Sequence, residues 1–277
     1  MAILEPYKHG YYLWKYIPSI EAAATFCALF IIATGAICHQ MIRNRAWFSI
    51  PLTVGGYMEV VGFACRAAAH NKTGKLMPYV IQQNNILLAP VLFAATIYMT
   101  LGRIIRNTGE ENLSFIRPKR ITRLFVTGDI LSLAIQGGAA GLMVVGTHNQ
   151  LAQAMVLTGL FLQIILFGIF CALAFVFDRR LRRYSTTVGL GDLQWDNMLR
   201  MLYVVCGLVM LRSIFRVVEY IMGVDGYLLS HEWPLYVFDA VPMLTVMFAF
   251  WRWFPTAAHR PTSLSSGTSM EILGPTK

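Results

Sequence analysis

The sequence has 277 residues, of which 56% are hydrophobic and only 13% are charged, and its net charge is +9. A soluble domain carries about a quarter charged residues, so the composition excludes an ordinary soluble protein, and recurring apolar runs of about 20 residues indicate a polytopic α-helical membrane protein. The positive charge is more simply explained by basic loops on one membrane face than by binding of nucleic acid.

Seven segments are apolar and long enough to cross a bilayer as helices. We therefore predict an all-α fold, a bundle of seven transmembrane helices over residues 17–254. A short extracellular segment, 1–16, precedes it, and a Ser/Thr/Pro/Gly-rich tail, 255–277, is expected to be disordered in the cytosol. The predicted segments are Ile17–Cys38, Trp47–Cys65, Tyr79–Ile105, Leu124–Val145, Leu151–Phe177, Met198–Met222 and Leu235–Phe254.

Proline and glycine mark local features inside these segments. Pro90 and Pro242 lie within the third and seventh segments, where each is expected to kink its helix. In the fourth segment, Gly137 and Gly141 lie four residues apart. This spacing of small residues predicts close packing against a neighbouring helix.

Most of the 23 Lys and Arg residues lie after the first, third and fifth segments and in the C-terminal tail. Cytosolic loops of membrane proteins carry the excess of basic residues. We therefore predict that the N-terminus lies outside and the C-terminus in the cytosol, most simply in the plasma membrane. Asn71 belongs to an Asn-Lys-Thr sequon on a predicted outer loop and is the candidate glycosylation site.

The sixth segment carries three charged residues in its apolar run. Arg212, Arg216 and Glu219 fall at positions i, i+4 and i+7, so they share one face of a helix. A charge near the bilayer centre costs about 2.5–3.5 kcal/mol on insertion scales. That face must therefore turn toward partners inside the bundle.

The predicted orientation places most other intramembrane polar residues in the outer half of the bundle, with Asp129 on the cytosolic side. Two interpretations stay open and are compatible: a polar pocket for the head group of an amphipathic ligand, or an ion network that fixes helix register. In the first interpretation, the carboxylates of Glu59, Glu219 and Asp239 receive the amine of a ligand. Arg66, Arg212 and Arg216 then compete with that amine for the same carboxylates. The candidate substrate-binding or gating residues are Glu59, Arg66, Gln82, Asn85, Gln136, Arg212, Arg216, Glu219, Glu232 and Asp239.

Common catalytic motifs are absent from the sequence. It contains no G-x-x-x-x-G-K-[ST], no G-x-S-x-G and no H-E-x-x-H. The histidines fall in predicted loops and tails, and the five cysteines lack metal-ligand spacing. We therefore expect no metal, no cofactor and no enzymatic activity.

Four motifs together carry a resemblance to a known family. They are Gly56–Arg66 in the second segment, Leu87–Pro90 with Ala94–Tyr98 and Leu101–Arg103 in the third, Gly128–Ile130 with Gln136–Gly138 in the fourth, and Arg212–Tyr220 followed by Gly223, Glu232, Tyr236 and Phe238–Ala240 in the sixth and seventh. In this order they resemble the fungal RTA-like family, also called lipid-translocating exporters. The resemblance covers nearly the whole chain.

The resemblance implies a fungal seven-span membrane protein. Family members are associated with release or flipping of sphingoid long-chain bases, with resistance to toxic amphipaths such as aminosterols, and with porphyrin or haem traffic. The family's motif residues map onto the ten candidates above and onto Asp129.

The leading functional prediction is a transporter or translocator of amphipathic lipids or toxic amphipaths. Its expected partners are membrane lipids and an amphipathic small molecule, with no nucleic acid, and its oligomeric state stays open. The alternative is a seven-span receptor or stress sensor that signals to a cytosolic partner.

Overall fold

The structure is a computed structural model, and it describes residues 14, 16–70, 73–107, 118–145, 149–188, 193–223 and 226–254. Within these residues the secondary structure is helical and contains no strand, which confirms the predicted all-α class. The sequon residue Asn71, nearly all of the N-terminal segment and the tail 255–277 lie outside the described residues.

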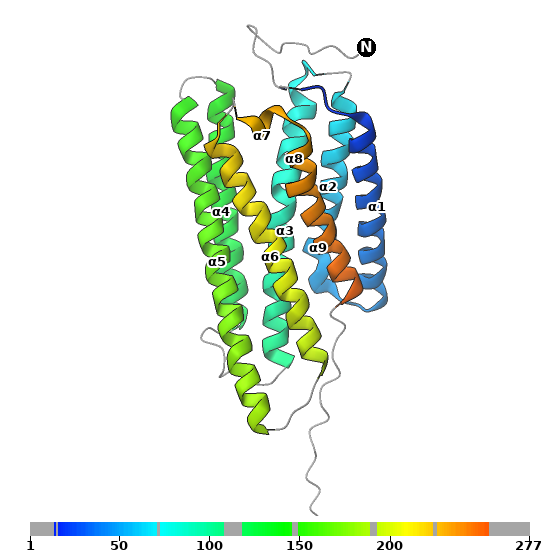
Figure 1. The fold of residues 1–277 in the computed structure, drawn as a ribbon, viewed down its shortest axis with the longest axis vertical. Coiled ribbons are helices and arrows are strands. Elements are labelled where there is room, and N and C mark those ends of the chain that lie inside the picture. The colour runs from blue at the N-terminus through cyan, green and yellow to red at the C-terminus, as the bar shows by residue number, and fades with distance from the viewer. Residues whose placement is uncertain are drawn as a thin grey trace, which may run out of the picture.

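The described part of the chain forms seven long helical rods (Figure 1). The first six are α1 (Ile20–Arg43), α2 (Ile50–Ala69), α3 (Leu76–Asn107), α4 (Pro118–Val145), α5 (Asn149–Val188) and α6 (Leu193–Ile221). The last rod runs without interruption through α8 (Trp233–Leu235), η3 (Tyr236–Ala240) and α9 (Val241–Arg252). Two short helices, η1 (Trp47–Ser49) and α7 (Tyr227–Ser230), lie in the connections.

Each predicted segment falls on one rod, and the largest shift is at α5, which continues past Phe177 to Val188. Six of the seven rods are long and apolar enough to cross a membrane, so the chain is an integral membrane protein. By the same criteria of length and hydropathy, applied to the described residues, α4 is not among the candidate membrane spans. This helix is nevertheless about 42 Å long at 1.5 Å per residue, and it packs between α3 and α5.

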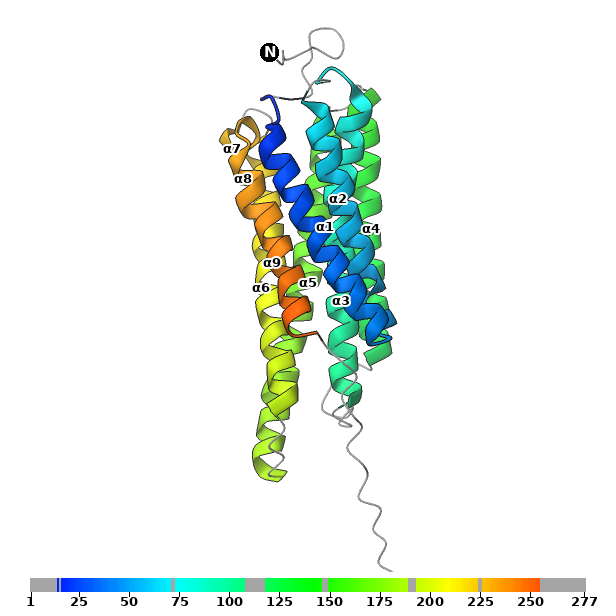
Figure 2. The ribbon, with the colours of Figure 1, turned by 90° about the vertical axis from the view of Figure 1, so that its right-hand side faces the viewer.

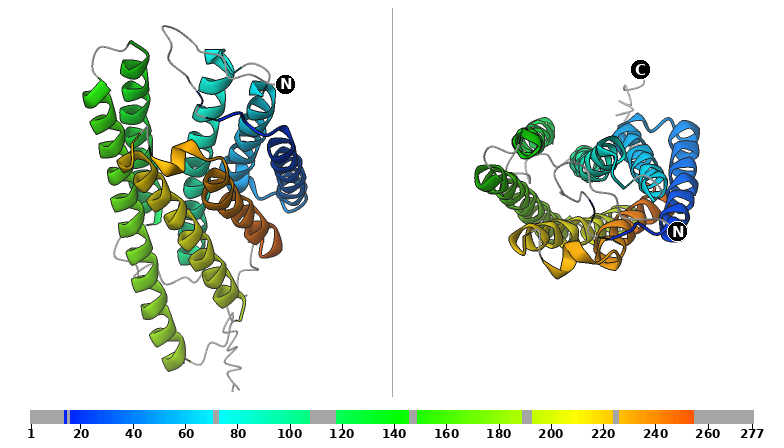
Figure 3. Two further views of the ribbon diagram at one scale, coloured as in Figure 1. Left: turned by 45° about the horizontal axis from the view of Figure 1, so that its top comes forward. Right: turned by 90° about the horizontal axis from the view of Figure 1, so that it is seen from above.

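The rods form a closed ring. Helices adjacent in sequence pack side by side from α1 to α6, and α9 closes the ring between α6 and α1 (Figure 3). A second view from the side shows α1, α2 and α9 on one face of the bundle (Figure 2). Helix α6 packs between α5 and α9 in the ring, and its inner face also contacts α3 on the opposite side of the ring. The end at which α1 begins is called the outer end below, following the predicted orientation.

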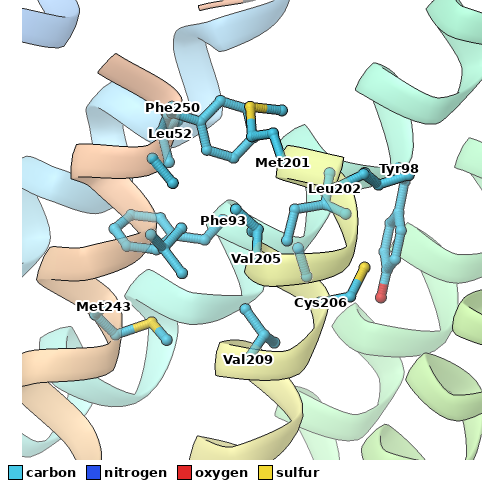
Figure 4. Packing of buried hydrophobic residues seen from close by; sticks show 14 of the residues in the cluster. Leu52, Phe93, Tyr98, Met201, Leu202, Val205, Cys206, Val209, Met243 and Phe250 are labelled. Atoms are coloured by element: carbon cyan, nitrogen blue, oxygen red, sulfur yellow. The ribbon is translucent and has the colours of Figure 1, made fainter. Parts of the chain in front are cut away.

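Apolar side chains fill the interior toward the cytosolic end (Figure 4). Met201, Val205 and Val209 of α6 lie before Arg212 along that helix and are buried against Phe93 of α3 and its neighbours. Large apolar side chains also cover the outside of the bundle, as a lipid-facing surface requires. Around α6 and α9 the interior is therefore mainly apolar toward the cytosolic end and charged toward the outer end, while Asp129 is a buried charge on the cytosolic side.

Two glycines allow close approach of helices. A Cβ atom at Gly62 of α2 would lie 2.7 Å from Cγ1 of Ile86 on α3, and one at Gly159 of α5 would lie 2.7 Å from Cγ of Gln136 on α4. The prediction of close packing at Gly137 is wrong, because that residue is exposed and its added Cβ would meet nothing within 4 Å. Helix α4 turns the opposite face toward α5, so the small residue at this contact belongs to α5.

Pro242 is the second residue of α9, and an irregular turn precedes this helix. Proline has no amide hydrogen, so in a regular helix it would leave the carbonyl of Phe238 without its donor. The chain instead forms a π-helical turn, η3, which ends one residue before the start of α9. This turn carries Asp239 to the interior, where it is 2% exposed.

Candidate functional site

The charged face of α6 turns inward, as predicted from its spacing. Arg212, Arg216 and Glu219 are all buried. Asp239 of η3 forms ion pairs with both Arg212 and Arg216. Arg216 also pairs with Glu219, with Nη1 2.9 Å from Oε2. One carboxylate from the last rod, Asp239, therefore holds two guanidinium groups of α6. The name inner cluster is used below for Arg212, Arg216, Glu219, Asp239 and Glu59 of α2.

Arg212 has a second partner on α3. Its Nη2 donates a hydrogen bond to the backbone carbonyl of Ile86 at 2.8 Å. In a regular helix that carbonyl would accept from the amide of residue 90, which is Pro90 and has no hydrogen to donate. The guanidinium thus supplies the donor that the proline removes, and it joins α6 to α3 at this depth.

Glu59 lies in the inner cluster but differs from its neighbours. Its side chain is 1% exposed, and neither carboxylate oxygen has a hydrogen-bond partner within the described residues. The charges of Asp239, Arg212 and Arg216 are close enough to act on it. Glu59 is therefore a buried acceptor whose oxygens stay open.

Arg66 forms a separate group nearer the outer end. Its guanidinium donates to Glu232 at 2.9 and 3.2 Å, to the Tyr236 hydroxyl at 3.1 Å and to the Tyr16 hydroxyl at 2.7 Å. The rings of Trp14, Tyr16 and Tyr236 lie 5.4–5.5 Å from its Cζ, within the range of cation–π attraction. These five residues are called the outer cluster.

Glu232 closes the ring of helices at the outer end. Both of its carboxylate oxygens accept from the backbone amide of Ser19, at 3.1 Å, just before α1 begins. It also accepts from the Tyr236 hydroxyl at 3.1 Å. Arg66, one of the arginines expected to compete for the carboxylates, therefore pairs with Glu232 and not with a carboxylate of the inner cluster. Tyr236 stands four residues after Glu232, a spacing from which this contact could have been predicted.

Gln82 and Asn85 of α3, two further candidates, differ in position. Gln82 is buried, and its Oε1 has no hydrogen-bond partner in the described part of the chain. Asn85 is partly exposed and donates to the carbonyl of Ile81 in its own helix at 2.8 Å. The structure therefore leaves Asn85 outside both clusters.

Gln136 and Asp129 of α4 lie at helix contacts away from α6. Gln136 donates to the Ser132 hydroxyl at 3.0 Å, and that hydroxyl donates to the carbonyl of Gly159 on α5. Asp129 accepts from the Tyr98 hydroxyl of α3 at 2.9 Å. These contacts join α4 to its two neighbours, so Gln136 does not belong with the inner cluster.

The arrangement offers hydrogen-bond and ionic recognition rather than metal ligation. Within the described residues, no group of three or more His, Cys, Asp or Glu side chains is placed to hold a metal ion. The inner cluster instead presents fixed guanidinium groups and a carboxylate with open oxygens. Groups of this kind bind and orient a charged head group without covalent chemistry.

Comparison with known proteins extends over most of the chain. Residues 52–261 match the model of a family described as RTA1 like protein. The chain is 38% identical to Protein RTM1 of Saccharomyces cerevisiae over 76% of this chain and 69% of that protein. It is 33% identical to Protoporphyrin uptake protein 1 of the same yeast, over 87% and 91% of the two chains. It is 24% identical to Sphingoid long-chain base transporter RSB1, also from Saccharomyces cerevisiae, over 90% and 75%. No solved structure is a significant match.

Proposed function

The chain belongs to the RTA1-like family, and from that membership we propose that it moves amphipathic small molecules across the plasma membrane. The proposed substrates are amphipaths with a cationic head, such as sphingoid long-chain bases and sterol amines, and their removal would confer resistance to them. One relative is named a sphingoid long-chain base transporter and another a protoporphyrin uptake protein. Both names support transport of an amphipath, and the first of them carries the proposal toward a cationic head.

The inner cluster is the observation that carries this proposal. Ionisable residues inside a membrane are expensive to bury and mark substrate or ion pathways. Here three carboxylates and two guanidinium groups lie in the outer half of the bundle. An ammonium head group would compete with Arg212 and Arg216 for those carboxylates, while its hydrocarbon chain would find apolar surroundings in the bilayer.

The test is leaflet exchange of a fluorescent sphingosine in liposomes that contain the purified full-length chain. We expect exchange well above that of protein-free liposomes. Glu219→Gln should reduce it strongly, because the substitution removes one carboxylate of the inner cluster while Asp239 still holds both arginines. Glu21→Gln is the matched control, since Glu21 is exposed near the start of α1.

Exchange no faster than in protein-free liposomes would contradict transport of this substrate. In that case a cytosolic partner recovered with the full-length chain would favour the receptor interpretation. Equal exchange by wild type and Glu219→Gln would show that transport does not depend on this carboxylate of the inner cluster.

A further inference from the structure

The inner cluster contains one more carboxylate than it has cations. Glu59, Glu219 and Asp239 face two guanidinium groups, Arg212 and Arg216, and each of the five side chains is at most 4% exposed. Guanidinium groups stay protonated in proteins. With all three carboxylates ionised, the cluster would therefore hold one uncompensated negative charge in the membrane interior.

The contacts identify Glu59 as the unmatched carboxylate. Asp239 pairs with both arginines, and Glu219 pairs with Arg216. The remaining donor of Arg212 is directed to the carbonyl of Ile86. Both oxygens of Glu59 lack a hydrogen-bond partner in the described residues. Because an unpaired buried carboxylate is strongly unfavourable, Glu59 requires either a bound proton or a bound cation.

The elements packed around Glu59 supply no further cation among the described residues. From α6 it is faced by Arg212 and Arg216, and from η3 by Asp239. The neighbouring α1 brings the Cys27 thiol, which donates to the carbonyl of Val60 with sulfur and oxygen 3.7 Å apart.

Two uncharged polar side chains on the helices that flank α2 also lack partners. Thr34 on α1 and Gln82 on α3 are both buried, and each carries an oxygen without a hydrogen-bond partner in the described part of the chain. Gln82 Oε1 can accept a hydrogen bond and the Thr34 hydroxyl can accept or donate one, so both groups are compatible with a cationic ligand that carries N–H donors.

Small residues on α2 let the neighbouring helices pack closely on both sides of Glu59. Gly56 and Gly62 stand three residues before and after Glu59. A Cβ atom at Gly56 would meet the side chains of Thr34 and Met247, and one at Gly62 would meet Ile86. Neighbouring helices therefore close against the backbone of α2 on either side of the carboxylate and hold Glu59 inside the bundle.

We propose that Glu59 is an exchange site that holds a proton when empty and releases it when the ammonium head group of an amphipath binds. In this step the O–H bond of the carboxylic acid breaks and the proton leaves to water. The carboxylate then pairs with the ammonium group, whose own bonds do not change, so the net charge of the site is conserved. The inference rests on the proposed function and adds that transport is coupled to a proton and selects cationic head groups.

The first test is labelling of the purified full-length chain with dicyclohexylcarbodiimide, which modifies protonated carboxyl groups in apolar surroundings. We expect modification at Glu59, with Glu219 and Asp239 spared because both are already engaged in ion pairs with arginines. Added sphinganine should suppress the modification, whereas a ceramide, which has no charge on its head group, should not. Absence of label at Glu59, or label that is unchanged by saturating sphinganine, would overturn the proposal.

The second test is proton release on binding of N,N,N-trimethylsphingosine in weakly buffered detergent solution. This probe has a fixed charge, so any released proton comes from the protein. We expect one proton per bound ligand for wild type and for Glu21→Gln, and none for Glu59→Gln. Release by Glu59→Gln at the wild-type level would assign the proton to another group and overturn the proposal.

The two proposals fail in different ways. Leaflet exchange without proton release would leave the proposed function standing and refute the role of Glu59. Absence of both exchange and binding of the cationic probe would refute both.

Discussion

At the scale of single residues, the best-defined contact of the inner cluster joins a side chain to the backbone. Arg212 donates to the carbonyl of Ile86, whose helical donor is missing because position 90 is a proline. A membrane interior offers no water to satisfy such a carbonyl. The proline of α3 and the arginine of α6 are therefore expected to depend on each other.

This dependence predicts coupling between two substitutions. Arg212→Met should lower thermal stability in detergent, because Asp239 and the Ile86 carbonyl both lose a partner. Pro90→Ala supplies an amide for that carbonyl and should offset part of the loss, with a coupling of about 0.5–1.5 kcal/mol, the range of one hydrogen bond. The measurement is a double-mutant cycle on the free energy of unfolding. Additive effects would show that Pro90 and Arg212 act independently.

The group of buried charges could be predicted from the sequence, but which arginine pairs with which carboxylate could not. The spacing of Arg212, Arg216 and Glu219 was enough to predict an inward face for α6. The partner of Arg66 was missed, because Glu232 lies in a connection whose path depends on where α1 and α8 meet. Side-chain pairing depends on helix rotation and depth to within a few ångströms, which hydropathy does not determine.

At the scale of elements, α4 and α5 pack through Gly159 on α5, which meets Gln136 and Ser132 of α4, and not through Gly137. A Cβ atom at Gly159 would lie 3.0 Å from the carbonyl oxygen of Ser132, a backbone atom that cannot move aside easily. Gly137 on α4 faces open space. The run of small residues indicated close packing correctly in kind but on the wrong helix, because the pattern does not say which face meets the neighbour.

The two glycines predict opposite effects of the same substitution. Gly159→Ala should destabilise the bundle by about 1–3 kcal/mol through overpacking against α4. Gly137→Ala should be neutral or stabilising by about 0.5–1 kcal/mol, because alanine is favoured over glycine inside a helix. Thermal unfolding of both variants in the same detergent makes the comparison. A loss of stability in Gly137→Ala equal to that in Gly159→Ala would contradict the assigned contact.

At the scale of the whole molecule, hydropathy predicted all seven rods, and it succeeded because each rod must satisfy its backbone internally in lipid. It could not predict the closure of the ring, in which α9 packs between α6 and α1. That closure follows from contacts between residues more than 200 positions apart, such as the hydrogen bond from Gln40 to the carbonyl of Trp251 at 3.1 Å.

The predicted orientation of the whole bundle can be tested by glycosylation mapping. The excess of arginine after the third and fifth segments places the sequon at Asn71 outside. In cells we therefore expect any N-linked glycan on Asn71, detected as a shift in gel mobility that Asn71→Gln removes. Asn112 begins a second sequon, Asn-Leu-Ser, in the predicted cytosolic connection after the third segment. A glycan on Asn112 instead would reverse the orientation and move both clusters to the cytosolic half.

The order of the ion pairs along the chain has a consequence for biosynthesis. Arg66 precedes Glu232, and Arg212 and Arg216 both precede Asp239. During translation these cations reach the membrane before the last rod brings their anions. A nascent chain arrested at Gly223 would hold Arg66 and Arg212 without these counter-ions, so quality control has a physical signal by which to recognise an unfinished product. The last rod thus brings the two carboxylates that complete the charge pairing of the helices synthesised before it.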